Sequence, residues 1–147
     1  MTWNPPADLD YASKQQVLRE YFDRYDFDTV IETGLYNGNG SCYQFTSEAH
    51  VYAIDMNPAN VVSARAKGVK AYCGDSGEVL AKILMRPALF WLDAHLVVEA
   101  EEENSSPLMA ELDAILAWEH AAASVLLIDD LRMMGREGWP TVEQVRE

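Results

Sequence analysis

Acidic side chains follow all five of the apolar, β-rich runs of this chain, and each of these positions could bind a ligand or take part in catalysis. They are Glu32, Asp55, Asp75 after Gly74, Asp93 with His95, and the pair Asp129-Asp130. Ligands of open α/β sheets bind beyond the carboxyl ends of the strands, so these side chains are expected at one edge of a sheet. Charged groups are rarely buried without partners. Ligand hydroxyls, amines or a metal ion would supply such partners.

A glycine-rich segment follows Glu32, with glycines at positions 34, 38 and 40. Glycine lets the backbone approach a ligand closely, and the N–H groups of a following helix would point into the same space. The spacing is not the G-x-G-x-x-G pattern of a dinucleotide site, and a carboxylate at Glu32 would repel a pyrophosphate. It suits a ligand with an ammonium group, such as S-adenosylmethionine, whose sulfonium is also cationic.

Asp55 and Asp75, the second and third of these acids, lie at positions that could contact the ribose and the base of a nucleoside. Asp55 lies 21 positions after the first glycine, near the ~20-residue separation at which an acid reaches ribose hydroxyls. Its alternative role is to favour the dipole of the helix that follows. Met56 could lie against an adenine ring or fill the core. Asp75 could accept from an adenine amino group, although residues 74–77 also suit an ordinary turn with a helix cap.

These motifs resemble the class I S-adenosylmethionine-dependent methyltransferases, in particular the metal-dependent O-methyltransferase branch that includes macrocin-type sugar enzymes. The resemblance covers roughly residues 28 to 145. It is carried by Glu32-x-Gly34-x-x-x-Gly38, Ile54-Asp55, Gly74-Asp75, Trp91-Leu-Asp93-Ala-His95 and Leu127-Ile-Asp129-Asp130.

The resemblance implies roles for particular residues. The expected cofactor-binding residues are Glu32, Gly34, Tyr36, Gly38, Asp55, Met56, Asp75, Ser76 and Asp93. The expected ligands of a divalent cation such as Mg²⁺ are Asp93, Asp129 and Asp130, which offer the oxygen atoms that hard cations prefer. Asp93 or His95 would accept the proton of a hydroxyl acceptor. The alternatives are that the Asp129-Asp130 pair only terminates a strand and that His95 is structural.

Short β-rich runs alternate with helical patterns, which is typical of β-α-β units. The expected fold is a Rossmann-like, three-layer α/β/α arrangement with a mostly parallel sheet of about five strands in the order 3-2-1-4-5. The strands are expected near residues 29–33, 51–55, 69–73, 89–93 and 125–129, and a first amphipathic helix over 13–25. Later helices are expected to follow N-caps at Asn57, Ser106 and Thr141.

One domain is expected over residues 1–147, with an N-terminal helical segment over 1–27 and a Rossmann-like core over 28–147. The strands that normally follow the fifth in this family are expected to be missing. An apolar fifth strand at the sheet edge would invite aggregation or a homodimer. The acidic run at 99–104 is either a solvated loop or a mobile lid.

Composition excludes several classes of partner. The chain of 147 residues has 24 Asp and Glu against 11 Lys and Arg, a formal charge of −13 that disfavours nucleic acid. No apolar run approaches the ~20 residues that span a bilayer, and no signal peptide is expected before the first helix. The two cysteines, Cys42 and Cys73, lack C-x-x-C spacing and suit a reducing, cytoplasmic compartment.

The leading hypothesis is therefore an S-adenosylmethionine-dependent methyltransferase that acts on a hydroxyl of a small molecule, a sugar or a phenol, with or without Mg²⁺. A truncated or degenerate module that binds S-adenosylmethionine without turnover is the first alternative. A nicotinamide-dependent oxidoreductase is the second, and the glycine spacing and Glu32 both disfavour it.

Overall fold

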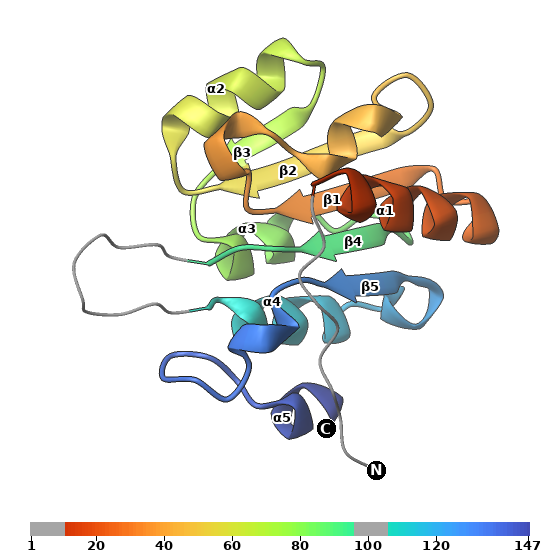
Figure 1. The fold of residues 1–147 in the computed structure, drawn as a ribbon. Helices are drawn as coiled ribbons and strands as arrows, with labels where there is room; N and C mark the ends of the chain where they lie inside the picture. The colour runs from red at the N-terminus through yellow and green to blue at the C-terminus, as the bar shows by residue number, and fades with distance from the viewer. Residues whose placement is uncertain (1–10, 96–105) are drawn as a thin grey trace.

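The computed structural model describes residues 11–95 and 106–147, which form a five-stranded sheet flanked by helices (Figure 1). The strands are β1 (Thr29–Thr33), β2 (His50–Asp55), β3 (Lys70–Cys73), β4 (Leu89–Leu92) and β5 (Val125–Ile128). Their order is β3-β2-β1-β4-β5, and all four strand pairs are parallel. The predicted Rossmann-like fold and strand order are confirmed, and each strand boundary lies within one residue of its expected position.

Helices lie before, between and after the strands along the chain. The α-helices are α1 (Tyr11–Tyr25), α2 (Pro58–Ala66), α3 (Ser76–Ile83), α4 (Leu108–Leu116) and α5 (Val142–Arg146). Four 3-10 helices are η1 (Tyr36–Gly38), η2 (Ser41–Phe45), η3 (Ala121–Ala123) and η4 (Leu131–Met133). No helix of the described ranges combines the length and apolar character that a bilayer crossing requires. The acidic run at 99–104 lies outside the described residues.

The two faces of the sheet are covered by different helices, which gives three layers (Figure 1). Successive side chains of a strand point to opposite faces, so the strand registers create two apolar rows. The row Val51, Val30, Leu89 and Val125 packs against α1, η2 and α2. The row Tyr52, Ile31, Phe90 and Leu126 packs against α3 and α4. Because both faces are buried, the strands are apolar nearly throughout rather than alternating.

Capping residues decide where the helices begin. Asn57 caps α2 as predicted, with its side-chain oxygen accepting from the Ala59 N–H at 2.9 Å. Thr141 and its capping-box partner also form the predicted cap of α5. The predicted start of α4 was wrong by one residue. The backbone of Pro107 lies outside the helical region, so Pro107 is the N-cap, and the Ser106 hydroxyl accepts from the first helical N–H at 3.2 Å.

Candidate functional site

Strand alternation directs four of the predicted acids to the same face of the sheet. Each of these acids follows, by two positions, an apolar residue that packs on the face covered by α1, η2 and α2. The acids are Glu32, Asp55, Asp93 and Asp129, and the apolar residues are Val30, Ala53, Trp91 and Leu127. All four acids lie at the carboxyl ends of their strands. The local structure thus brings acids from β1, β2, β4 and β5 to one edge.

A cavity of about 640 Å³ opens at this edge, and its volume is typical of sites for cofactors and drug-sized molecules. Its lining includes the glycine loop after β1, the ends of β2 and β4, the first turn of α3, and the start of α4. Seven of the nine predicted cofactor residues line it, namely Gly34, Tyr36, Asp55, Met56, Asp75, Ser76 and Asp93. The predicted catalytic His95 lines it as well.

Glu32 is not among the lining residues. Its side chain is buried, and its two oxygens accept from the backbone N–H groups of Ser41 and Cys42 at 3.0 and 2.8 Å. Burial raises the pKa of Glu32 to about 7, although these hydrogen bonds oppose the shift. The glycine loop continues into the 3-10 helix η2 and not into an α-helix, and Glu32 caps that helix. The N–H groups that were expected to face a ligand are therefore bonded to Glu32.

Gly38 also lies away from the cavity lining. Its carbonyl oxygen accepts from the Tyr43 hydroxyl at 2.7 Å and from the Lys67 ammonium at 3.2 Å. Its backbone φ of +70° suits glycine, and a Cβ at this position would lie 2.9 Å from the hydroxyl of Ser63. Gly38 thus shapes the loop, and its predicted contact with a cofactor stays a prediction.

Asp55 joins the glycine loop to α2. One of its oxygens accepts from the Leu35 N–H at 2.6 Å and from the Asn60 side-chain amide at 3.2 Å, and the other accepts from the Asn57 N–H at 2.7 Å. The carboxylate nevertheless lines the cavity together with Asn60, which the sequence did not single out. Asp55 therefore supports the loop, and it also presents an acceptor where a ligand could bind.

Asp75 and Ser76 lie at the start of α3. The Asp75 carboxylate accepts from the Glu78 N–H at 3.2 Å, so the predicted helix cap is present, and the same residue lines the cavity. Behind Ser76 lies Glu111 of α4, whose side chain is buried. Burial raises the pKa of Glu111, and the nearby hydroxyls of Ser76 and Thr33 oppose that shift. Glu111 was missed because helical spacing placed it beside apolar positions without indicating a partner.

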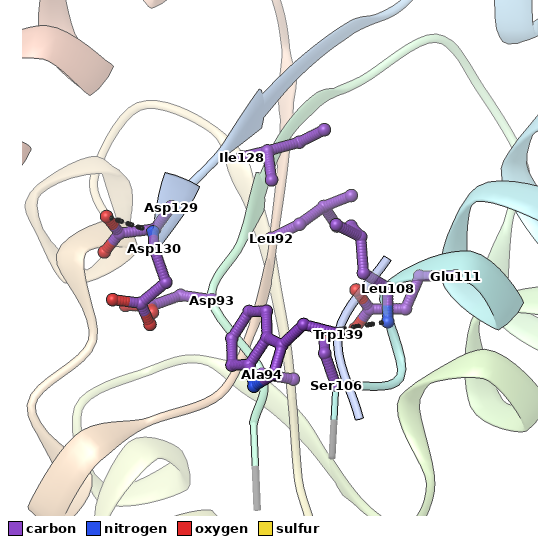
Figure 2. A pocket seen from close by; sticks show the side chains of 10 residues that line it. All are labelled: Leu92, Asp93, Ala94, Ser106, Leu108, Glu111, Ile128, Asp129, Asp130 and Trp139. Atoms are coloured by element: carbon purple, nitrogen blue, oxygen red, sulfur yellow. Dashed lines mark hydrogen bonds between the residues drawn. The ribbon is translucent and has the colours of Figure 1, made fainter. Parts of the chain in front are cut away.

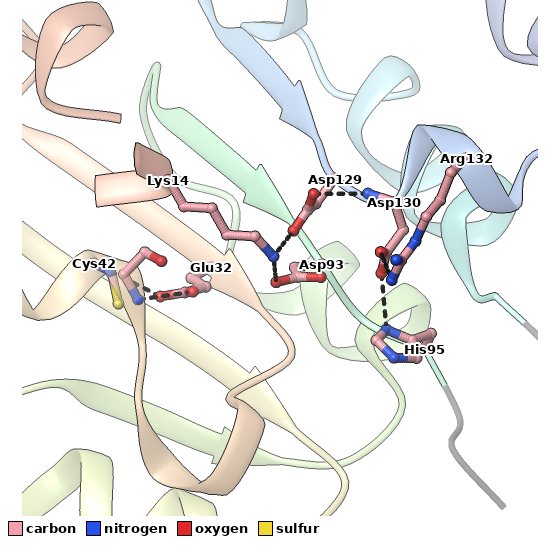
Figure 3. A network of polar contacts seen from close by, with 9 residues as sticks. Lys14, Glu32, Cys42, Asp93, His95, Asp129, Asp130 and Arg132 are labelled. Carbon is pink, nitrogen blue, oxygen red and sulfur yellow. Dashed lines mark hydrogen bonds and ion pairs between the residues drawn. The ribbon is translucent and has the colours of Figure 1, made fainter. Parts of the chain in front are cut away.

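The predicted metal ligands separate into two groups (Figure 3). Asp93, His95 and Asp130 each offer one ligand atom, and these atoms lie within 4.8 Å of one another. Asp129 is not in this group. Its Oδ2 accepts from the Lys14 ammonium, and its Oδ1 accepts from the Asp130 N–H at 2.8 Å. Of the predicted ligands, Asp93 and Asp130 could hold a cation together with His95, and Asp130 is also paired with the Arg132 guanidinium at 3.3 Å.

Asp93 has the electrostatic environment of a proton acceptor. Burial and the neighbouring carboxylates of Asp129 and Asp130 raise its pKa to about 8, while the Lys14 ammonium opposes the shift. A carboxylate with a pKa near the working pH is a stronger base than an exposed one. His95 lies at the same edge, with its Nδ1 3.3 Å from an Asp130 oxygen.

A second, much smaller cavity of about 10 Å³ lies between the ends of β4 and β5 and the start of α4 (Figure 2). It is about large enough for one water molecule. The buried indole Nε1 of Trp139 and Oε1 of Glu111 have no hydrogen-bond partner among the described residues, and both residues line this space. The Trp139 ring also lies 5.9 Å from the ring of His95, which it helps to position.

The large cavity and the adjoining Asp93, His95 and Asp130 could bind a nucleoside ligand beside a second small molecule. The chain matches no known protein-family model, and no curated protein matches it in sequence. A function for this chain is therefore inferred from the cavity and its side chains.

Proposed function

We propose that this chain is an S-adenosylmethionine-dependent methyltransferase that transfers a methyl group to a hydroxyl oxygen of a small molecule. The observation that carries the proposal is the 640 Å³ cavity at the carboxyl ends of the strands. It is bordered by the glycine loop at Gly34 and by the acids Asp55 and Asp93. This is the position at which open α/β sheets bind nucleotide-like ligands.

The charges around the cavity favour a cationic donor. Asp55 would hold the ribose hydroxyls, and Asp75 and Ser76 would lie near the base. The main chain of Asp93 lies against Gly34, and the residue lines the cavity, where its ionised carboxylate would attract an ammonium or a sulfonium group. The same carboxylates would repel the pyrophosphate of a nicotinamide dinucleotide.

The methyl group of the donor is carried by a sulfonium and is transferred in line to the acceptor oxygen. The C–S bond breaks as the C–O bond forms, S-adenosylhomocysteine leaves, and the hydroxyl proton passes to Asp93 or His95. A divalent cation held by Asp93, His95 and Asp130 would stabilise the alkoxide form of the acceptor. The protein's own contribution is to align the two ligands and accept the proton.

Ligand binding is the first test. S-adenosylhomocysteine at 100 times its dissociation constant should raise the free energy of unfolding by about 2.7 kcal/mol, measured as a thermal shift. NAD at the same concentration should give no shift. Stabilisation by NAD and not by S-adenosylhomocysteine would overturn the proposal in favour of an oxidoreductase.

Turnover is the second test. The protein is incubated with methyl-labelled donor and a panel of phenols, catechols and sugars, with Mg²⁺ or with a chelator, and the label is followed into the acceptor. We expect transfer to at least one hydroxyl compound. Tight binding of S-adenosylhomocysteine without any transfer would instead identify a binding module that lacks activity.

A further inference from the structure

Glu111 of α4 is an acid at a position where an apolar residue would fit. It is 1% exposed, and helical spacing places it on the same face as Leu108, Leu112 and Ile115, which pack in the core. Burial is the main cause of its raised pKa. A buried carboxyl without a cation lowers the stability of a fold, so such a departure is expected mainly at positions that serve function.

Two hydroxyls from other elements act on the Glu111 carboxyl. Thr33 ends β1 and Ser76 begins α3, and the hydroxyls of both favour the ionised form of Glu111. Thr33 Oγ1, Ser76 Oγ and Glu111 Oε1 are all buried, and within the described ranges none of the three has a hydrogen-bond partner of ordinary geometry. We call these three side chains the Glu111 cluster. It joins β1, α3 and α4 and has unused hydrogen-bonding capacity.

The Glu111 cluster lies next to one wall of the large cavity. Gly34 follows Thr33 and lines the cavity, and Asp75, which precedes Ser76, lines it as well. Ser76 itself is also a lining residue. The cluster therefore connects the two segments that form this wall, the glycine loop after β1 and the first turn of α3.

The first turn of α3 packs closely on α4. A Cβ atom at Gly77 would lie 2.7 Å from the Cβ of Ala110, the residue before Glu111. Asp75 begins this turn, because its carboxylate accepts from the Glu78 N–H at 3.2 Å and its carbonyl accepts from the Val79 N–H at 2.9 Å. The contact between α3 and α4 therefore helps to decide where the Asp75 carboxylate lies in the cavity.

We infer that Glu111 is a positioning residue of the large cavity, whose carboxyl gathers the Thr33 and Ser76 hydroxyls and so fixes the start of α3 relative to the end of β1. Glu111 acts through this wall and does not line the large cavity itself. That the wall contacts a nucleoside rests on the proposed function. The position of the α3 start does not, and it can be measured without any ligand.

Amide hydrogen exchange of the ligand-free protein, followed by nuclear magnetic resonance, tests this position. The reporters are the Glu78 and Val79 N–H groups, which both bond to Asp75. Glu111→Leu removes the carboxyl at similar volume and should speed their exchange by at least about tenfold. Glu111→Gln keeps a side chain that can bond to both hydroxyls, so it should speed their exchange by less than about threefold.

A control variant separates this local effect from a general loss of stability. Ile115→Val removes a buried methyl group from the same helix, one turn after Glu111. It should change exchange at the α3 start no more than exchange in β1, whereas Glu111→Leu should act mainly at the α3 start. If Glu111→Leu does not fold, as judged by circular dichroism, Thr33→Val and Ser76→Ala decide the question, because each removes one hydroxyl and should speed the same two amides selectively.

Calorimetry with S-adenosylhomocysteine extends the test to the cavity. Glu111→Leu should bind it about tenfold more weakly than wild type, Glu111→Gln within about threefold of wild type, and Ile115→Val like wild type. A wild type that does not bind this ligand would overturn the proposed function, and the exchange measurement would then decide the role of Glu111 by itself.

Three results would overturn the inference. The first is exchange at the α3 start that is no faster in Glu111→Leu than in Ile115→Val. The second is weaker ligand binding in Glu111→Leu without selective exchange at the α3 start, since Glu111 would then act by another route. The third is selective exchange with unchanged affinity for a ligand that wild type binds, because the α3 start would then not position the cavity wall.

Discussion

Gly34 lies directly against the main chain of Asp93. A Cβ atom at Gly34 would be 2.4 Å from the Asp93 carbonyl oxygen and 2.9 Å from the Cα of Ala94. The Asp93 N–H also donates to the Thr33 carbonyl at 3.0 Å, so a hydrogen bond joins the ends of β1 and β4 next to this contact. One backbone contact therefore sets the distance between the glycine loop and the acid proposed as proton acceptor.

Gly34→Ala should destabilise the fold through this contact. Gly34 has a φ of +81°, and Gly135 offers a matched control because its φ is +82° and no atom lies within 4 Å of its added Cβ. Gly135→Ala should cost about 1–2 kcal/mol for the left-handed backbone alone. Gly34→Ala should cost about 1–3 kcal/mol more, because the neighbouring backbone must move. If urea unfolding shows that Gly34→Ala and Gly135→Ala lower the free energy of unfolding equally, the Gly34–Asp93 contact adds no cost of its own.

Glu32→Gln should change how stability depends on pH. The pKa of Glu32 is about 7 in the folded protein against an ordinary value of 4.5. Because the folded pKa is raised, the contribution of this group to stability is full below pH 4.5 and is lost as pH rises to 7. That loss is on the order of 3 kcal/mol. Gln cannot ionise, so the stability of the variant relative to wild type should increase between pH 5 and 8.

Urea unfolding at several pH values measures this difference. The exposed Glu119→Gln removes the same charge and is the control. The amide introduced by Glu32→Gln keeps only one acceptor oxygen for the Ser41 and Cys42 N–H groups, so the variant should be less stable than wild type at pH 5 by about 1–3 kcal/mol. Parallel stability curves for wild type and Glu32→Gln would contradict the expected pH dependence.

The sequence predicted which acids reach the cavity edge better than it predicted what they contact. Apolar strands that end in acids are visible as local patterns, so Asp55 and Asp93 were found. The partner of Asp129 was not, because Lys14 is 115 positions away and the amphipathic pattern of α1 does not say which strands the helix crosses. Glu32 was placed at the correct strand end, but its contacts depend on a 3-10 helix whose form the glycine spacing did not reveal.

Asp55→Asn should remove discrimination between ribose and deoxyribose. If the Asp55 carboxylate accepts from a ribose hydroxyl, wild type should bind adenosine at least about tenfold more tightly than 2′-deoxyadenosine. In the variant that ratio should fall below about threefold, since an amide accepts hydrogen bonds more weakly than a carboxylate. Asn also offers one oxygen for the Leu35 and Asn57 N–H groups, so the fold should lose about 1–3 kcal/mol.

Competition calorimetry with adenosine and 2′-deoxyadenosine gives the ratio of their affinities for wild type and for Asp55→Asn. The control is Asp75→Asn, which makes the same change from carboxylate to amide at another residue of the cavity. Asp75→Asn should keep the wild-type preference for ribose. An unchanged preference in Asp55→Asn would leave Asp55 with only its role in holding Leu35 and Asn57.

Asp93→Asn should impair turnover far more than donor binding. Asp93 lines the cavity, and its raised pKa suits it to accept the acceptor's proton. General base catalysis contributes about 10²–10⁴-fold, so kcat should fall by that factor with an acceptor identified by label transfer. The affinity for S-adenosylhomocysteine should change by less than about tenfold, because the nucleoside contacts remain.

His95→Gln tests whether the neighbouring imidazole shares this role. If Asp93 and His95 act as one unit, the double variant should lose no more kcat than Asp93→Asn alone, because their effects are not additive. If His95 takes the proton by itself, His95→Gln should cause the larger loss. An Asp93→Asn variant that keeps more than about half of the wild-type kcat would exclude Asp93 as the base, since even weak general bases contribute about 10²-fold.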